Sequence, residues 1–159
     1  AVEFDPVQAR GTAFGKTNVI AERAVVAGDL RALTNEQFQK AMAAMREIVA
    51  ASLPRTRAEL TFDEGYPPLG PTAGNERLLV LYDRVSRDLG FGPVEAVNPD
   101  RAGAADVSFI AGEVPMIIDA AGMKGRDGHT VGETADLTAL PLQAKRAAVL
   151  IARLARGAK

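Results

Sequence analysis

The residue whose type offers the most chemistry is His129, the only histidine in the chain. A neutral imidazole is the commonest metal ligand and the usual proton shuttle in proteins. Catalytic zinc normally takes three protein ligands, and without cysteine only carboxylates could join this imidazole. Asp127, Glu133 and Asp136 are near in sequence, but their spacing matches no established metal site. His129 with its neighbours alone is therefore expected to bind zinc poorly.

A serine nucleophile is a second source of chemistry that the composition leaves open. Ser52, Ser86 and Ser108 are each available to a Ser-His-Asp triad with His129. None of the three stands in the Gly-x-Ser-x-Gly turn that exposes the nucleophile of α/β-hydrolases. A triad is therefore neither predicted nor eliminated by the sequence.

The Asp29-Leu30-Arg31 segment is the candidate for binding a carboxylate. Strand alternation would place Asp29 and Arg31 on one face, where the two form either a solvated surface pair or a ligand site. An arginine guanidinium can bind a carboxylate through two parallel hydrogen bonds, which lysine cannot. Asn18 is available for a further hydrogen bond. Gly103, in a turn of small residues, permits either a plain turn or close backbone approach to a ligand.

The overall composition is that of one globular domain. The chain has 159 residues, of which 47% are hydrophobic and 25% charged. Its net charge of −1 gives no basic excess for nucleic-acid binding. The apolar runs are far shorter than the roughly 20 residues of a membrane helix, so no membrane partner is expected. No signal peptide is visible, and the compartment stays open between the cytoplasm and the periplasm.

Residues 18–63 are expected to form a strand–helix–strand unit. Thr34 and Gln37 fit a capping box, and apolar residues then follow at helical spacing until about Ser52, ahead of Pro54. Gly28 marks a bulge in the strand before this helix. The strands are predicted from β-branched content and alternation, at residues 18–20, 23–33 and 58–63.

A proline-rich connector, residues 66–71, is the predicted domain boundary. A helix capped by Asn75 should follow and end before Gly90, and a final helix should open at Leu140-Pro141 and end before Gly157. Between them lie a Gly-rich loop at residues 122–132 and three short strand candidates, at residues 94–97, 107–110 and 116–118. This alternation of helices and strands predicts the α/β or α+β class.

Several short motifs, taken in order, resemble the di-zinc metallopeptidase family of glutamate carboxypeptidase, aminoacylase and succinyl-diaminopimelate desuccinylase. The likeness is closest to the glutamate carboxypeptidase branch and covers essentially the whole chain. The ordered set carries it rather than any one motif: Thr17-Asn18-Val19-Ile20, Gly28-Asp29-Leu30-Arg31, Gly128-His129-Thr130 with Glu133 and Asp136, and Leu140-Pro141 before a Lys-Arg-Ala-Ala helix.

The resemblance implies a two-part fold. Residues 1–67 correspond to the second half of a ferredoxin-like lid (dimerisation) domain, and residues 72–159 to the C-terminal part of the α/β catalytic domain of a zinc exopeptidase. The other zinc ligands, the general-base Glu and a lid His belong to an N-terminal catalytic portion that this chain lacks. A homodimer formed through the lid is also implied.

The resemblance also assigns individual residues. His129 matches the last zinc ligand, Arg31 the lid arginine that holds the substrate carboxylate, Asn18 its neighbouring amide, and Gly103 the turn lining the substrate pocket. Ala104 and Ala105 stand where many relatives have Thr or Ser. The family uses two zinc ions, or other divalent metals, to polarise a carbonyl and activate water.

Two classes of function follow. The first is a fragment of a zinc-dependent exopeptidase or amidohydrolase that cleaves a peptide or N-acyl amide bond next to a free carboxylate, inactive as an isolated chain. No residue of this chain is then itself a catalytic acid, base or nucleophile. The alternative is a non-catalytic dimerisation or small-carboxylate-binding module.

Overall fold

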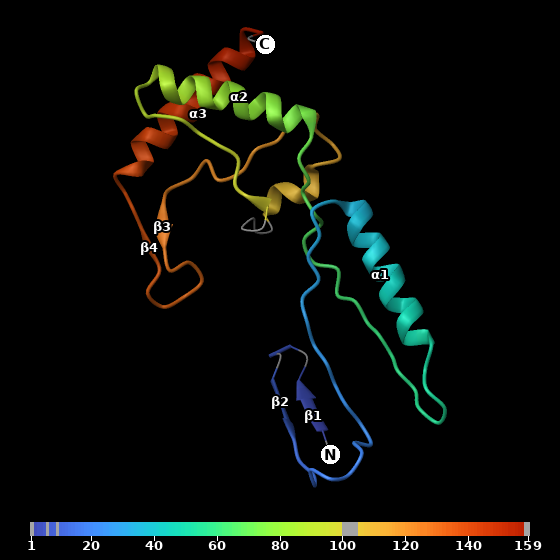
Figure 1. Ribbon diagram of the computed structural model, residues 1–159. Helices are drawn as coiled ribbons and strands as arrows, with labels where there is room; N and C mark the ends of the chain where they lie inside the picture. The colour runs from blue at the N-terminus through green and yellow to red at the C-terminus, as the bar shows by residue number, and fades with distance from the viewer. Residues whose placement is uncertain (1, 6, 9, 100–104, 158–159) are drawn as a thin grey trace. The chain divides into compact units, whose positions relative to one another are not determined.

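The computed structural model describes residues 2–5, 7–8, 10–99 and 105–157, and within them it is a mixed α and β structure. Helices dominate, and the strands form two separate two-stranded antiparallel sheets. The elements in chain order (Figure 1) are β1 (Val2–Asp5), β2 (Arg10–Ala13), α1 (Asn35–Ala50), α2 (Ala73–Asp88), the 3-10 helix η2 (Asp106–Ile110), β3 (Gly125–Arg126), β4 (Thr134–Ala135) and α3 (Ala139–Ala155).

The chain divides into two compact units, Ala1–Arg31 and Ala32–Lys159. The first unit holds the β1–β2 hairpin, in which Val2 faces Ala13 and Phe4 faces Gly11. From Pro6, Gly11 and Gly15 among mixed polar residues, the sequence predicts an extended, loop-like segment over residues 1–17, and this prediction is wrong where the two strands form. Pairing of the two four-residue strands stabilises this hairpin, and the mixed polar sequence did not reveal it.

Helix α1 forms as the sequence predicts, capping box included. The Thr34 hydroxyl accepts the Gln37 N–H at 3.2 Å, and the Gln37 side-chain oxygen accepts the Thr34 N–H at 3.3 Å. These reciprocal bonds satisfy backbone groups that a helix start leaves unpaired. Met42, on the predicted apolar face, is buried, and the Arg46 guanidinium lies 5.0 Å from the centre of the Phe62 ring.

The main core of the second unit lies between α2 and α3 (Figure 1). Its buried cluster consists of Leu78, Tyr82, Val85 and Leu150, with Val85 fully buried. Leu78, Tyr82 and Val85 recur at helical spacing on α2, so one stripe of that helix faces Leu150 of α3. Burying a side chain of this size contributes about 1.5–3 kcal/mol.

Helix α2 begins earlier than predicted, because Thr72 rather than Asn75 is its N-cap. The Thr72 hydroxyl accepts the Asn75 N–H at 3.1 Å. The Asn75 side chain is engaged elsewhere, since its oxygen accepts the Ile117 N–H at 2.9 Å. Both threonine and asparagine favour N-caps, so propensity alone could not choose between them. The end of α2 before Gly90 and of α3 before Gly157 is confirmed, and both glycines adopt positive φ angles.

None of the six predicted strands forms. Residues 18–20, 23–33, 58–63, 94–97 and 116–118 contain no strand, and the stretch from 107 to 110 lies in the 3-10 helix η2. A strand is stable only when a neighbour accepts and donates its backbone hydrogen bonds, and alternation in sequence does not supply that neighbour. The predicted strand–helix–strand unit therefore reduces to α1 with irregular chain on both sides.

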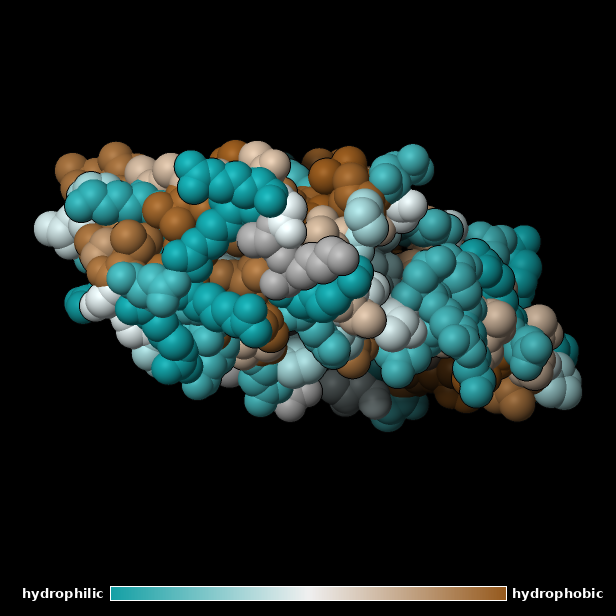
Figure 2. Space-filling view, turned by 90° about the horizontal axis from the view of Figure 1, so that it is seen from above, coloured by the Kyte–Doolittle hydropathy of each residue, from teal (hydrophilic) through white to brown (hydrophobic). Residues whose placement is uncertain are grey.

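Two large apolar side chains of α3 remain exposed. Leu140 is 52% and Ile151 66% exposed, although Leu150 of the same helix is buried in the core cluster with α2. Figure 2 shows apolar side chains lying among polar ones on the face viewed from above. In the described part of the chain, no helix has both the length and the apolar content needed to cross a bilayer.

Gly74 tests how closely helix α2 packs against the segment at Pro115. A Cβ atom added there would lie 1.9 Å from the Pro115 carbonyl oxygen, so Gly74→Ala must push the segment at Pro115 away from the helix. We expect a loss of about 1–3 kcal/mol in the free energy of unfolding, measured by urea denaturation, although alanine is the better helix former.

Gly112→Ala is the matched control, because nothing lies within 4 Å of a Cβ at that position. It should change stability by less than about 1 kcal/mol. Equal stability of Gly74→Ala and the unmodified protein would contradict the described packing of α2 on the segment at Pro115.

Candidate functional site

His129 lies in the loop of a small hairpin formed by β3 and β4. Gly125 pairs with Ala135 and Arg126 with Thr134, so residues 127–133 form the connection. This places the histidine within the Gly-rich segment that the sequence predicted as a loop, although the strands flanking it were not foreseen.

The backbone of this loop is held by its own side chains. The His129 N–H donates to a carboxylate oxygen of Glu133 at 3.2 Å, and the Thr130 hydroxyl donates to the Asp127 carbonyl at 2.7 Å. Asp127 and His129 have φ angles of 55° and 65°. Non-glycine residues seldom adopt this left-handed conformation, and where they do the surroundings must hold them there.

The His129 side chain is exposed, and its ring has no hydrogen-bond or ion-pair partner within the part of the chain that the structure describes. The Glu133 carboxylate contacts the backbone of His129 rather than its ring. Over residues 2–5, 7–8, 10–99 and 105–157, no three His, Cys, Asp or Glu side chains are grouped so that they could hold a metal ion. The chain therefore offers one accessible imidazole at this loop.

The three candidate serines are not paired with His129. Ser86 is fully buried and its hydroxyl donates to the Gly92 carbonyl at 2.6 Å, while Ser52 donates to the Val49 carbonyl at 3.4 Å. Ser108 is buried in η2. The structure assigns these hydroxyls no contact with the imidazole, so nothing in it supports a triad.

Arg31 and Asn18 belong to the first unit, whereas His129 belongs to the second. The Arg31 Nε lies 2.6 Å from an Asp29 carboxylate oxygen, and the two side chains are 75% and 69% exposed. An ion pair this exposed contributes only about 0–1 kcal/mol. Asn18 is exposed in a turn, and the described residues show no hydrogen bond between it and Arg31. Gly103 lies outside the described residues.

Close to the position of Gly103 in sequence, the structure shows a contact that sequence reasoning missed. The Tyr66 hydroxyl donates to an Asp106 carboxylate oxygen at 2.8 Å, and the Tyr66 and Phe109 rings lie 5.1 Å apart. The hydrogen bond and the negative charge of Asp106 both favour the neutral phenol and raise the pKa of Tyr66. This contact joins the proline-rich connector to η2, across forty positions of sequence, where no local pattern could reveal it.

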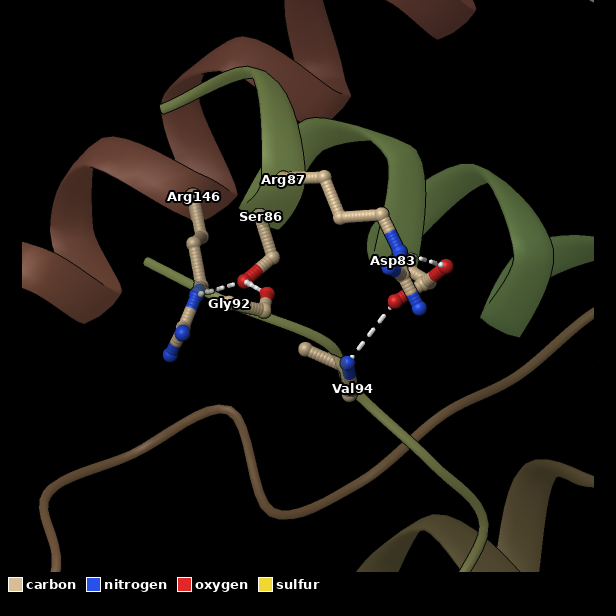
Figure 3. A network of polar contacts seen from close by, with 6 residues as sticks. All are labelled: Asp83, Ser86, Arg87, Gly92, Val94 and Arg146. Atoms are coloured by element: carbon tan, nitrogen blue, oxygen red, sulfur yellow. Dashed lines mark hydrogen bonds and ion pairs between the residues drawn. The ribbon is translucent and has the colours of Figure 1, made fainter. Parts of the chain in front are cut away.

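A polar network was also missed, and it joins α2, α3 and the chain after α2 (Figure 3). The Arg146 Nε donates to the Ser86 hydroxyl at 3.0 Å, and Ser86 in turn donates to the Gly92 carbonyl. Asp83 accepts the Val94 N–H and the Arg87 Nε, both at 2.8 Å. These two hydrogen bonds stabilise the carboxylate and hold the pKa of Asp83 below its usual range.

Asp136 stabilises the short connection between strand β4 and helix α3. Its carboxylate accepts the Thr138 N–H at 2.9 Å and the Thr138 hydroxyl at 2.5 Å, while its own N–H donates to the Lys124 carbonyl at 2.8 Å. The hydrogen bonds from Thr138, hydroxyl first, hold the pKa of Asp136 below its usual range. The sequence singled out Asp136 only as a neighbour of His129.

Comparison with known proteins adds no family assignment, since no protein-family model matches the sequence and no solved structure matches it significantly.

The lowered pKa of Asp136 predicts a pH dependence of stability. Because the folded-state pKa lies below the unfolded value of about 3.9, the stabilisation is complete above that value and is lost as the pH falls through the lower, folded-state pKa. Asp136→Asn keeps an oxygen for Thr138 but removes the charge. The free energy of unfolding of Asp136→Asn should be lower than that of the unmodified protein at pH 7, and the difference should vanish in strong acid. Urea denaturation at a series of pH values measures this difference.

Asp119→Asn serves as the control for removing one negative charge from the same segment. A deficit in Asp136→Asn that is independent of pH, or equal to that of Asp119→Asn at every pH, would contradict the role of the charged carboxylate at the root of the hairpin.

Proposed function

We propose that the chain supplies the C-terminal portion of a zinc-dependent exopeptidase or amidohydrolase. The substrate is a peptide or N-acyl amino acid whose scissile bond lies next to a free carboxylate. The observation that carries the proposal is the state of His129. Its backbone is fixed in a left-handed conformation while its ring is exposed and, over the described residues, unpartnered.

A fixed backbone with an accessible ring is what a metal ligand needs. An imidazole already engaged by the protein at both nitrogens would have no atom for the metal. Strained backbone at a non-glycine residue is also concentrated at functional sites. The hydrogen bond from the His129 N–H to Glu133 holds the backbone at this position and leaves both ring nitrogens unoccupied.

The described residues do not complete a zinc site by themselves. One imidazole falls short of the three protein ligands that catalytic zinc normally takes. In this proposal the other ligands and the general base belong to a further catalytic portion outside these 159 residues, as the family resemblance implies. The exposed apolar side chains of α3, Leu140 and Ile151, are consistent with a surface that such a portion covers.

The finer architecture forms part of the same proposal. Residues 72–159, with α2 and α3, correspond to the C-terminal part of an α/β catalytic domain, and residues 1–67, with α1, to half of a lid that pairs two copies of the enzyme. In this assignment Arg31 and Asn18 bind the substrate carboxylate from the lid and Gly103 lines the pocket. A bound carboxylate would replace Asp29 as the partner of Arg31, at little cost because that ion pair is exposed.

The metal-ligand role predicts zinc-dependent changes at a single imidazole. Because His129 is the only histidine, its ring signals in an NMR spectrum are assigned without ambiguity. Titration of the chain with Zn²⁺ should shift or broaden them, with the weak affinity expected of an incomplete ligand set. His129→Gln should abolish zinc binding measured by calorimetry.

Glu133→Gln is the matched variant, since it keeps a side-chain oxygen for the His129 N–H while removing the carboxylate. It should still bind zinc through the imidazole. Equal zinc affinity in His129→Gln and the unmodified chain would contradict the assignment of this residue as a ligand.

The carboxylate-binding role predicts an affinity change at Arg31. Removing a hydrogen-bonded charge contact costs about 1.5–3 kcal/mol, so Arg31→Ala should weaken binding of an N-acyl amino acid by about 10- to 100-fold. Arg31→Lys should recover only part of the loss. In an active assembly, Arg31→Ala should raise the KM for this substrate. The same acyl amino acid with its carboxylate converted to an amide should be insensitive to the substitution.

Arg23→Ala, an exposed arginine of the same unit, controls for the loss of one positive charge. Unchanged affinity in Arg31→Ala would remove Arg31 from the proposal. Carboxylate binding that depends on Arg31, in an assembly that hydrolyses nothing with zinc present, would instead favour the small-carboxylate-binding module.

A further inference from the structure

We propose that Gln143 is a positioning residue for His129, because its side-chain amide holds one arm of the β3–β4 hairpin on α3. The inference rests on the proposed role of His129. It goes beyond that role by identifying what keeps the imidazole in place relative to the core of the second unit.

Gln143 is buried at 9% exposure and makes three hydrogen bonds. Its oxygen, Oε1, accepts the Tyr82 hydroxyl at 3.1 Å and an Arg146 guanidinium N–H at 2.9 Å. Its nitrogen, Nε2, donates to the Gly122 carbonyl at 2.9 Å. One side chain thus connects α2, α3 and the first residue of the Gly-rich loop.

The neighbours of Gln143 also determine which way its amide points. Tyr82 and Arg146 both present donors, so the atom facing them is the oxygen. The NH₂ group is then left facing Gly122, where the carbonyl accepts it. Arg146 is itself held by Ser86 at 3.0 Å (Figure 3) and by the Phe91 carbonyl at 3.3 Å, so the donor that orients Gln143 is fixed in turn.

The hairpin is joined to α3 at both of its arms. The returning arm enters the helix directly through Asp136 and Thr138. The outgoing arm is joined at Gly122 by Gln143, which lies one helical turn beyond Ala139 at the start of α3. Pairing of β3 with β4 and the bond from Asp136 N–H to Lys124 then link the arms to each other.

Over the described residues, the bond from Gln143 to Gly122 is the one side-chain hydrogen bond or ion pair that connects α2 or α3 to residues 119–135. Without it the outgoing arm keeps its pairing with the returning arm and, five residues before Gly122, the bond from the Ile117 N–H to Asn75. The hairpin beyond Ile117 would then be freer to move about Asp136, and His129 would move with it. The bond is therefore a tether whose loss should loosen the hairpin more than the helix pair.

The substitution Gln143→Glu removes the hydrogen bond to Gly122 and keeps the other two hydrogen bonds of this side chain. A carboxylate still accepts from Tyr82 and Arg146, but it cannot donate to Gly122 and places negative charge beside that carbonyl oxygen. Tyr82→Phe is the matched control, because it removes a hydrogen bond to the same oxygen and leaves the donor to Gly122 intact. Gln143→Met, of similar length and without polar atoms, is the second tether variant should the carboxylate prevent folding.

The measurement is backbone ¹⁵N relaxation and amide hydrogen exchange on the full chain without metal, together with the line shape of the His129 ring. In Gln143→Glu we expect lower order parameters and faster exchange over residues 122–133 and a sharper, more mobile imidazole signal. The amides of α2 and α3 should keep their protection. Tyr82→Phe should leave the hairpin and the ring signal unchanged.

Unchanged order of residues 122–133 in Gln143→Glu would overturn the proposal. So would loosening that spreads equally through α2 and α3, because Gln143 would then only stabilise the helix pair. A zinc titration of the same samples separates this proposal from the proposed function. If the unmodified chain showed no zinc effect at His129, the metal role would fail while the metal-free hairpin data still decided the tether.

Discussion

The second unit depends on the packing of α2 against α3 around Val85, Tyr82 and Leu150. Apolar burial drives this contact, and the polar groups at its edge give it a single arrangement. Gln143 and Arg146 are hydrogen-bonded to each other and to groups of α2 and the neighbouring chain, and no buried side-chain polar atom of the described residues lacks a partner. A satisfied polar network of this kind specifies register, because any slip of one helix along the other leaves a buried group without its bond.

The sequence predicts what is local. The capping box at Thr34 and the helix ends before Gly90 and Gly157 depend on residues within one or two turns, and all are confirmed. The six strand predictions were wrong, because a stretch of alternating apolar and polar residues does not specify which other segment will pair with it. Contacts such as Tyr66 with Asp106, or Gln143 with Gly122, join distant positions and have no local signal. His129 and Arg31 were found by residue type, and whether they share a site stays a prediction.

The same helix pair connects fold to proposed function. The β3–β4 hairpin is joined to α3 at one arm through Asp136 and at the other through Gln143. The loop that carries the exposed His129 side chain is therefore connected to the helix pair at both ends. Leu140 and Ile151 of α3 are exposed among the described residues. Under the proposed function, a further catalytic portion would cover these apolar side chains and add the metal ligands that one imidazole needs.

The most direct measurement is a native mass spectrum of the purified protein, since it reports bound chains and bound metal together. The account predicts that the chain of 16.7 kDa retains no zinc tightly when alone or paired with itself, and that two zinc ions appear only in a heavier assembly with a further chain. Two tightly held zinc ions on the lone chain, or an active heavier assembly free of metal, would contradict it.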